Sequence, residues 1–188
     1  MHLCQMNKDK LINSAVKVLN EDFHAPLEKI AEVAQISKRT LYRYFKDREV
    51  LITACYADML ENWYQAMVTA FNSDNDPIKQ LEAMLHAAID CGVKYIFLHT
   101  LEEKHVDVAD MDKDKILAYE RTKEKWFAMV PELQEKHIID NRLSAPWIRH
   151  LFESMARTSV KALNSGDVAP NDLKKFAWLS FSRSIGIR

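Results

Sequence analysis

Residues 27–51 read LEKIAEVAQISKRTLYRYFKDREVL, and this segment carries most of the structural information in the chain. Pro26 precedes it and suits the first turn of a helix, so we expect a short helix to begin there. The apolar side of that helix consists of Leu27, Ile30, Ala31 and Ala34. Ser37 is a natural N-cap for a second short helix over Lys38–Tyr44. Only residues 35–37 separate the two helices, and this spacing predicts a helix-turn-helix.

Two further helices flank this pair. Residues 8–20 predict a helix on the N-terminal side, because apolar residues recur there every three or four positions. On the other side, Asp47 can cap a long helix in which one apolar stripe runs for about five turns. The stripe consists of Leu51, Cys55, Met59, Trp63, Ala66 and Ala70.

The composition favours helices throughout the chain. Only three of the 188 residues are glycine, whereas average usage would give about 13. Glycine supplies the turns of hairpins and of phosphate-binding loops, so sheet-rich folds and glycine-rich nucleotide sites are disfavoured. The motifs G-x-G-x-x-G and G-x-x-x-x-G-K-[ST] are both absent. We therefore predict an all-α fold of about nine helices, with the five prolines as helix punctuation.

The periodicity after the long helix predicts a second, larger helical domain. Its expected helices cover residues 77–89, 93–101, 116–133, 144–163 and 171–184, with a polar loop at 105–113. We place the boundary so that residues 1–50 form the helix-turn-helix domain. Residues 51–188 then form the helical domain to which the long helix leads.

Positive charge is concentrated on the predicted second helix of the helix-turn-helix. The whole chain has a net charge of −1, but residues 35–48 carry five cations against Asp47, a local charge of +4. A helix of this length fits the major groove of DNA, where Arg39 and Lys38 can reach base edges. Hydroxyl groups suit phosphate oxygens, and Arg48 adds charge at a helix N-terminus that itself attracts phosphate. The candidate DNA contacts are Ser37, Lys38, Arg39, Thr40, Tyr42, Arg43, Tyr44, Lys46 and Arg48.

Residues 27–51 resemble the DNA-binding domain of the tetracycline-repressor (TetR) family of transcription regulators. The segment from Ile36 to Phe45 is close to the recognition helix of that family. The resemblance implies a homodimeric, ligand-responsive regulator that represses transcription from a near-palindromic operator. It also implies that the last two helices pair with those of a second copy. The dimer contacts expected on this basis are Trp147, Leu151, Ala177, Ser180 and Ser184. A cytoplasmic protein is expected because no N-terminal apolar run resembles a signal peptide and no run of about 18 apolar residues could span a bilayer. No cofactor and no catalytic residue are expected.

Three positions depart from the usual pattern of the resembled family. Asp22 and Gln35 stand where that family often has glycine, after the first helix and in the turn before the recognition helix. A residue with a side chain costs roughly 1–2 kcal/mol where the backbone needs a positive φ. Arg39 stands where a small residue is common, and it adds a long cation that can alter the operator sequence recognised.

The helical domain of residues 51–188 is expected to have a regulatory role and to enclose a cavity for a small apolar or amphiphilic effector. The candidate lining residues are Trp63, Met67, Phe97, His99, Tyr119, Trp126, Phe152 and Met155. His99 or His86 could supply a polar contact. Plain core packing explains each of these residues as well, because all of them lie on mostly apolar helix faces.

Two alternative functions remain open at this point. One is a helical metal-binding protein or enzyme, because Glu102-x-x-His105 has the spacing of a di-iron motif. That motif has no second copy, and solvated helix faces explain the pairs His86/Asp90 and His99/Glu103 as well, so no metal site is expected. The other alternative is a regulator-like module that does not bind DNA.

The three cysteines, Cys4, Cys55 and Cys91, are expected to be free thiols in a reducing compartment.

Overall fold

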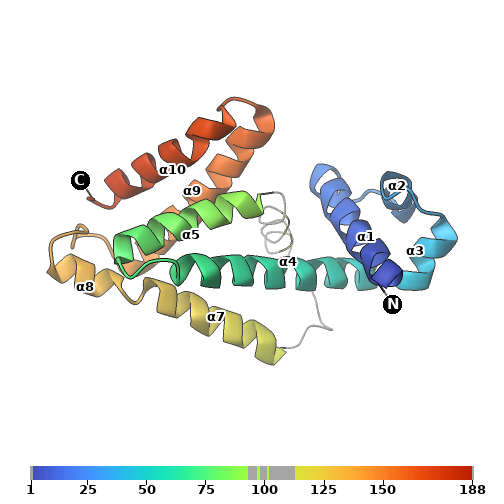
Figure 1. The fold of residues 1–188 in the computed structure, drawn as a ribbon, viewed down its shortest axis with the longest axis horizontal. Helices are drawn as coiled ribbons and strands as arrows, with labels where there is room; N and C mark the ends of the chain where they lie inside the picture. Colours follow the sequence, from blue (N-terminus) through green and yellow to red (C-terminus); the bar gives the residue numbers. More distant parts are fainter. Residues whose placement is uncertain (1, 93–96, 98–100, 102–112, 188) are drawn as a thin grey trace. The chain divides into compact units, whose positions relative to one another are not determined.

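The computed structural model describes residues 2–92, 97, 101 and 113–187, and all of its regular elements are helices. The helices are α1 (His2–Glu21), α2 (Leu27–Val33), α3 (Lys38–Tyr44), α4 (Arg48–Phe71), α5 (Pro77–Cys91), α7 (Lys113–Phe127), α8 (Val130–Glu135), α9 (Ala145–Ser165) and α10 (Pro170–Ser184) (Figure 1). The predicted all-α fold with an N-terminal helix-turn-helix is confirmed. Across the described segments, no helix is both long enough and apolar enough to cross a bilayer.

The chain divides into two compact units, and the division falls inside α4. The first unit contains α1 to α3 and α4 as far as Trp63, together with the described residues Phe97 and Leu101. The second unit begins at Tyr64 and contains the end of α4 together with α5 and α7 to α10. These units are groups of mutual contacts, so the predicted domain boundary at residue 50 stays a prediction.

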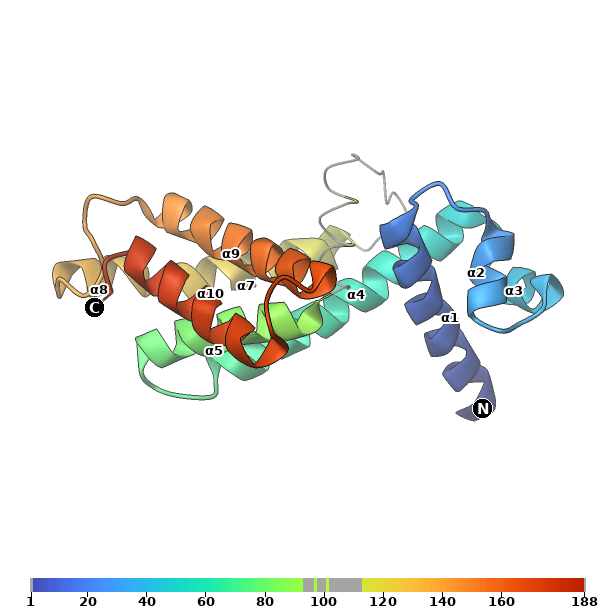
Figure 2. The same cartoon turned by 90° about the horizontal axis from the view of Figure 1, so that it is seen from above.

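Helices α1 to α3 and the beginning of α4 surround the core of the first unit. Helix α1 packs against α2, and α2 packs against α3 (Figure 2). The apolar stripe of α1 is buried, as the periodicity predicted, and the beginning of α4 adds to the same core. The fully buried side chains of this core include Leu11, Leu19, Ile30, Leu41, Phe45, Leu51 and Met59.

Helices α5, α9 and α10 pack against one another in the second unit (Figure 2). Their facing sides are apolar, and an ion pair joins α10 to α5 through Lys174 Nζ and Asp90 Oδ2 at 2.6 Å. The buried side chains of these three helices include Leu81, Met84, Leu85, Ile148, Phe152, Val160, Leu173 and Phe181.

The predicted helix over residues 116–133 is wrong in one respect, because the structure has two helices there. Helix α7 ends at Phe127, and α8 begins at Val130 with Pro131 in its first turn. Proline has no N–H and its ring clashes with the carbonyl four residues earlier, which here belongs to Phe127. Pro131 therefore starts a new helix and cannot continue the old one. The expected helix 93–101 lies outside the described residues except for Phe97 and Leu101, which are helical and buried.

Candidate nucleic-acid interface

Helix α3 is held by one cap and two buried side chains. The backbone N–H of Thr40 donates to Ser37 Oγ at 3.1 Å, so Ser37 is the N-cap that the sequence predicts. Leu41 and Phe45 are 1 % and 2 % exposed, and both point into the core of the first unit. Among the other side chains of α3, Lys38, Arg39, Tyr42 and Arg43 are exposed.

The turn before α3 has the backbone conformation that favours glycine. Gln35 has a φ of +57°, and the N–H of Ile36 donates to the carbonyl of Ala31 at 3.0 Å. The other departure from the family pattern behaves differently. Asp22 does not have a positive φ, and its Oδ1 accepts a hydrogen bond from the N–H of His24 at 2.9 Å. Of these two positions, Gln35 alone occupies a conformation that a side chain makes costly.

Most of the cations expected to bind DNA are exposed on α3 or just after it. Lys38, Arg39 and Arg43 are exposed, as is Tyr42, whereas Thr40 and Tyr44 are half-buried. Lys46, which follows α3, is exposed as well. The guanidinium of Arg43 lies 5.4 Å from the ring centre of Tyr44.

Lys38 is tied to the neighbouring helix. Its Nζ lies 3.2 Å from Oε1 of Glu28 on α2. Backbone hydrogen bonding and the ammonium of Lys38 hold the pKa of Glu28 below its ordinary value, so this partner is ionised at neutral pH. A DNA contact by Lys38 must therefore compete with Glu28.

Arg48 makes internal contacts that the sequence reasoning missed. Its Nη1 donates to the carbonyl of Ala25 at 2.6 Å, and its Nη2 donates to the carbonyl of Phe23. The side chain is half-buried, and its guanidinium carbon lies 5.6 Å from the ring centre of Phe23. The contact of Arg48 with a DNA phosphate stays a prediction, and the geometry gives this side chain a second role.

The residues proposed to line an effector cavity lie in different parts of the structure. His99 is outside the described residues, and Trp63 and Phe97 belong to the first unit. The remaining members, all in the second unit, are Met67, Tyr119, Trp126, Phe152 and Met155. Every described member of the set is buried except Met155, which is half-buried.

Aromatic side chains of the second unit form two groups. In one group the ring centre of Tyr64 lies 4.6 Å from that of Tyr119 and 6.3 Å from that of Trp126. In the other, the ring centre of Phe152 lies 5.5 Å from that of Phe127 and 5.6 Å from that of Phe181. Tyr64 was missed by the sequence reasoning, although it follows the candidate Trp63 directly.

The second unit also contains buried polar atoms without a hydrogen-bond partner among the described residues, on His86 and Arg149. His86, the alternative polar contact, has its Nε2 buried without a hydrogen-bond partner among the described residues. It lies on α5, the helix that packs against α9 and α10.

Large apolar side chains are exposed on both α9 and α10. Trp147, Phe176 and Leu179 are each 54 % exposed. Ser180 and Ser184 are exposed, and Leu151 is half-buried. Ala177, another expected dimer contact, is only 3 % exposed, because it lies on the buried side of α10 together with Leu173, Phe181 and Ile185. Its contact with a second copy stays a prediction.

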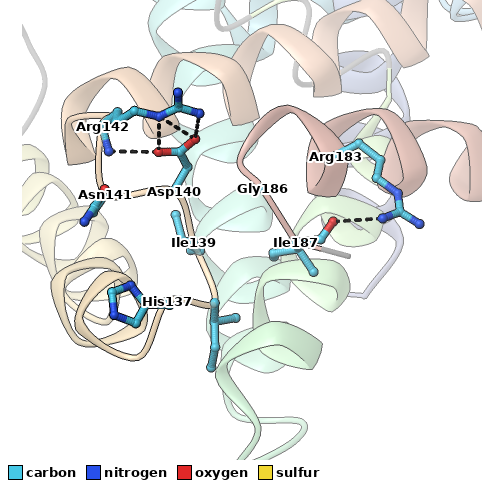
Figure 3. A pocket seen from close by; sticks show the side chains of 9 residues that line it. His137, Ile139, Asp140, Asn141, Arg142, Arg183, Gly186 and Ile187 are labelled. Atoms are coloured by element: carbon cyan, nitrogen blue, oxygen red, sulfur yellow. Dashed lines mark hydrogen bonds and ion pairs between the residues drawn. The ribbon is translucent and has the colours of Figure 1, made fainter.

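An open pocket of about 790 Å³ lies between the α8–α9 loop and the end of α10 (Figure 3). Its walls are mostly polar, and none of the candidate effector-binding residues lines it. Nη2 of Arg142 lies 2.5 Å from Oδ2 of Asp140, and this guanidinium holds the pKa of Asp140 at about 2. The carboxylate of Asp140 neutralises Arg142, whereas Arg183, the second arginine of the wall, donates from Nη1 to the carbonyl of Ile187 at 3.5 Å.

Possible metal ligands do not gather anywhere in the part of the chain that the structure describes. Within it, no group of three or more histidine, cysteine or acidic side chains is close enough to hold a metal ion. The Glu102-x-x-His105 motif lies outside the described residues, as do His99 and Glu103.

Comparison with known proteins identifies the N-terminal domain. Residues 11–55 match the family model described as "Bacterial regulatory proteins, tetR family". No curated protein sequence matches this chain. The matched range spans the second half of α1, the helix-turn-helix and the beginning of α4, and therefore includes every candidate DNA contact.

Solved structures share the fold over almost the whole chain. A TetR-family transcription regulator from Marinobacter aquaeolei VT8 superposes with a TM-score of 0.70 at 16 % identity, covering 100 % of both chains. The TetR-like regulator LfrR from Mycobacterium smegmatis, solved in complex with proflavine, gives a TM-score of 0.71 at 20 % identity over 96 % of this chain and 97 % of its own. PfmR from Thermus thermophilus gives 0.68 at 14 % identity over 96 % of each chain.

The resemblance to the TetR family is thereby confirmed at two levels. Residues 11–55 match the model of that family, and the whole chain has the fold of TetR-family transcription regulators.

Proposed function

We propose that this protein is a homodimeric transcriptional repressor that binds a near-palindromic operator and is released by a small apolar or amphiphilic effector. The exposed cationic face of α3 carries this proposal. Leu41 and Phe45 fix the inner side of α3, and Lys38, Arg39 and Arg43 are left on the outer side. A rigid helix that presents cations to solvent is what the major groove of DNA accepts.

The exposed cations are expected to divide into two kinds of contact. Arg39 has no partner among the described residues and can donate two hydrogen bonds to a guanine, which gives sequence preference. Lys46 follows α3 and is exposed, so it suits a phosphate and contributes affinity without preference. Lys38 can join either group only by leaving Glu28.

Dimerisation through α9 and α10 would give the symmetry that a palindrome needs. The exposed apolar side chains Trp147, Phe176 and Leu179 suit a face that a second copy covers. Ser180 and Ser184 lie on the same helix as Phe176 and permit close approach of two helices. Two recognition helices would then sit about 34–36 Å apart, one turn of DNA.

The aromatic groups of the second unit support an aromatic or amphiphilic effector. Tyr64, Tyr119 and Trp126 supply stacking surface. The buried Nε2 of His86, which has no hydrogen-bond partner among the described residues, is a polar atom that a ligand could satisfy. LfrR, which shares the fold, was solved with the aromatic compound proflavine. An effector that prefers a dimer geometry unable to bind the operator would weaken DNA binding. By thermodynamic linkage, bound DNA would then weaken effector binding by the same factor.

DNA selection followed by a matched pair of substitutions tests the proposal. The full chain is incubated with a pool of random-sequence duplexes, and a palindromic consensus is expected among the duplexes it retains. Arg39→Ala should then weaken binding to that consensus by about 1–3 kcal/mol and relax the preference at one position of each half-site.

The control variant is Lys125→Ala, which removes one exposed cation from α7, outside the DNA-binding domain. It should leave affinity and preference unchanged. Recovery of no consensus, or equal losses for the two variants, would count against sequence-specific DNA binding through α3.

A further inference from the structure

Arg48 joins the first residue of α4 to the loop between α1 and α2. Its two terminal nitrogens donate to the carbonyl oxygens of Ala25, 23 residues earlier, and of Phe23, and its guanidinium lies over the Phe23 ring. We propose that Arg48 is a positioning residue that sets the orientation of α3 for DNA binding. The inference rests on the proposed DNA-binding function and changes the role of a residue first assigned to a phosphate contact. We call this set of contacts the Arg48 clasp.

The clasp closes the helix-turn-helix into a ring. The chain leaves the loop at Ala25, runs through α2 and α3, and returns at Arg48, where the two ends are hydrogen-bonded to each other. Helices α2 and α3 have seven residues each, well below the length at which an isolated helix is stable in water. The buried side chains of these two helices are Ile30, Ala31 and Leu41, so few core contacts fix how the helices are oriented. The hydrogen bonds of Arg48 at the base of the ring add a further constraint on that orientation.

The loop is braced from its other side by Asp22. The carboxylate of Asp22 accepts from the N–H of His24 at 2.9 Å, and its carbonyl accepts from the N–H of Ala25 at 3.0 Å. Asp22 therefore holds the N–H groups of the loop, while Arg48 holds its carbonyl groups. This arrangement explains why the position can carry aspartate where the resembled family often has glycine.

The chemistry of the clasp requires arginine. A guanidinium is a planar fork with several N–H donors, so it can reach two carbonyls at once and still stack on a ring. A lysine has one ammonium on a flexible chain and cannot reproduce both contacts in one geometry. Lysine does, however, keep the positive charge and can still bind a phosphate as a point charge. Arg48→Lys therefore separates the two roles.

The test uses the full chain, the consensus duplex selected by the wild-type protein, and the variants Arg48→Lys and Arg48→Gln. Both variants should weaken DNA binding by about tenfold or more, because each loses charge-assisted hydrogen bonds. The slope of log K against log salt should stay unchanged. Amide exchange at His24 and Ala25 should rise in both variants, measured without DNA and under conditions where circular dichroism shows the protein folded.

Two further variants serve as comparisons. Lys46→Gln removes an exposed cation and should lower the salt slope by about 0.9 per protomer while leaving amide exchange unchanged. Asp22→Ala loosens the loop without touching Arg48, so it should weaken DNA binding at an unchanged salt slope. It keeps the inference testable if the Arg48 variants do not fold.

The clasp is overturned if Arg48→Lys keeps wild-type affinity while Arg48→Gln lowers the salt slope, because Arg48 is then a phosphate contact. It is also overturned if amide exchange in the loop is unchanged in both Arg48 variants, or if Asp22→Ala loosens the loop without weakening DNA binding. If the wild-type chain selects no duplex, the proposed function fails, and amide exchange still decides whether the clasp fastens the loop.

Discussion

Gln35→Gly is expected to stabilise the protein. Gln35 has a φ of +57°, which costs a residue with a side chain about 1–2 kcal/mol. Its side chain is exposed and makes no hydrogen bond among the described residues, so little is lost with it. The greater freedom of glycine in the unfolded chain offsets about 0.5–1 kcal/mol. The free energy of unfolding should therefore rise by about 0.5–1 kcal/mol.

Asp22→Gly should have the opposite sign, although the resembled family often has glycine at both places. Asp22 does not have a positive φ, so no backbone strain is relieved. The substitution removes the hydrogen bond from the N–H of His24, worth about 0.5–1.5 kcal/mol, and adds the entropic cost of glycine. The free energy of unfolding should fall by about 1–2 kcal/mol.

Urea unfolding of the full chain, followed by far-ultraviolet circular dichroism, measures both changes. Gln35→Ala is the matched control, because it removes the same side chain and keeps the strained backbone. Its free energy of unfolding should lie within about 0.5 kcal/mol of wild type. If Gln35→Gly is no more stable than Gln35→Ala, the turn carries no backbone penalty and the reasoning is refuted.

Three other perturbations act on the second unit. Gly186→Ala should destabilise the protein by about 1–3 kcal/mol in the same urea assay, because φ is +91° and a Cβ would lie 3.1 Å from the backbone N of Asp140. The pKa of about 2 for Asp140 means that its folded carboxylate resists protonation, so the stability it contributes is lost as the pH falls from about 4 to 2. The urea concentration at the unfolding midpoint should decrease over this pH range in the wild-type protein, and it should decrease less steeply in Arg142→Ala. Leu179→Glu should convert the proposed dimer into monomers by sedimentation, and an unchanged dimer would place the interface elsewhere.

Sequence periodicity is sufficient to predict the burial of a residue where that burial depends only on the helix to which the residue belongs. The inward positions Leu41 and Phe45 could be predicted because residues four apart share one face of a helix. Ser37 could be predicted as a cap because its partner is only three residues away. The break before α8 depends on Pro131 alone, but the sequence reasoning gave more weight to the apolar pattern than to proline.

Contacts between distant residues could not be predicted in this way. The sequence shows that Arg48 is a cation at a helix start, but its carbonyl partners are more than 20 residues earlier in the chain. Only the path of the loop reveals that the guanidinium points inward. The burial of Ala177 could not be predicted for a related reason, because a stripe of small residues does not show which side of α10 meets α9 and α5.

The shallow anchoring of α3 has a consequence for how such a protein can change over evolutionary time. Leu41 is the one side chain of this helix recorded as buried, and Phe45 follows directly after its end. Substitutions at the exposed positions 39, 42 and 43 should each shift stability by only about 0.5 kcal/mol or less, because they leave no cavity and no unpaired buried group. A lineage can therefore acquire a new operator sequence one substitution at a time while every intermediate still folds.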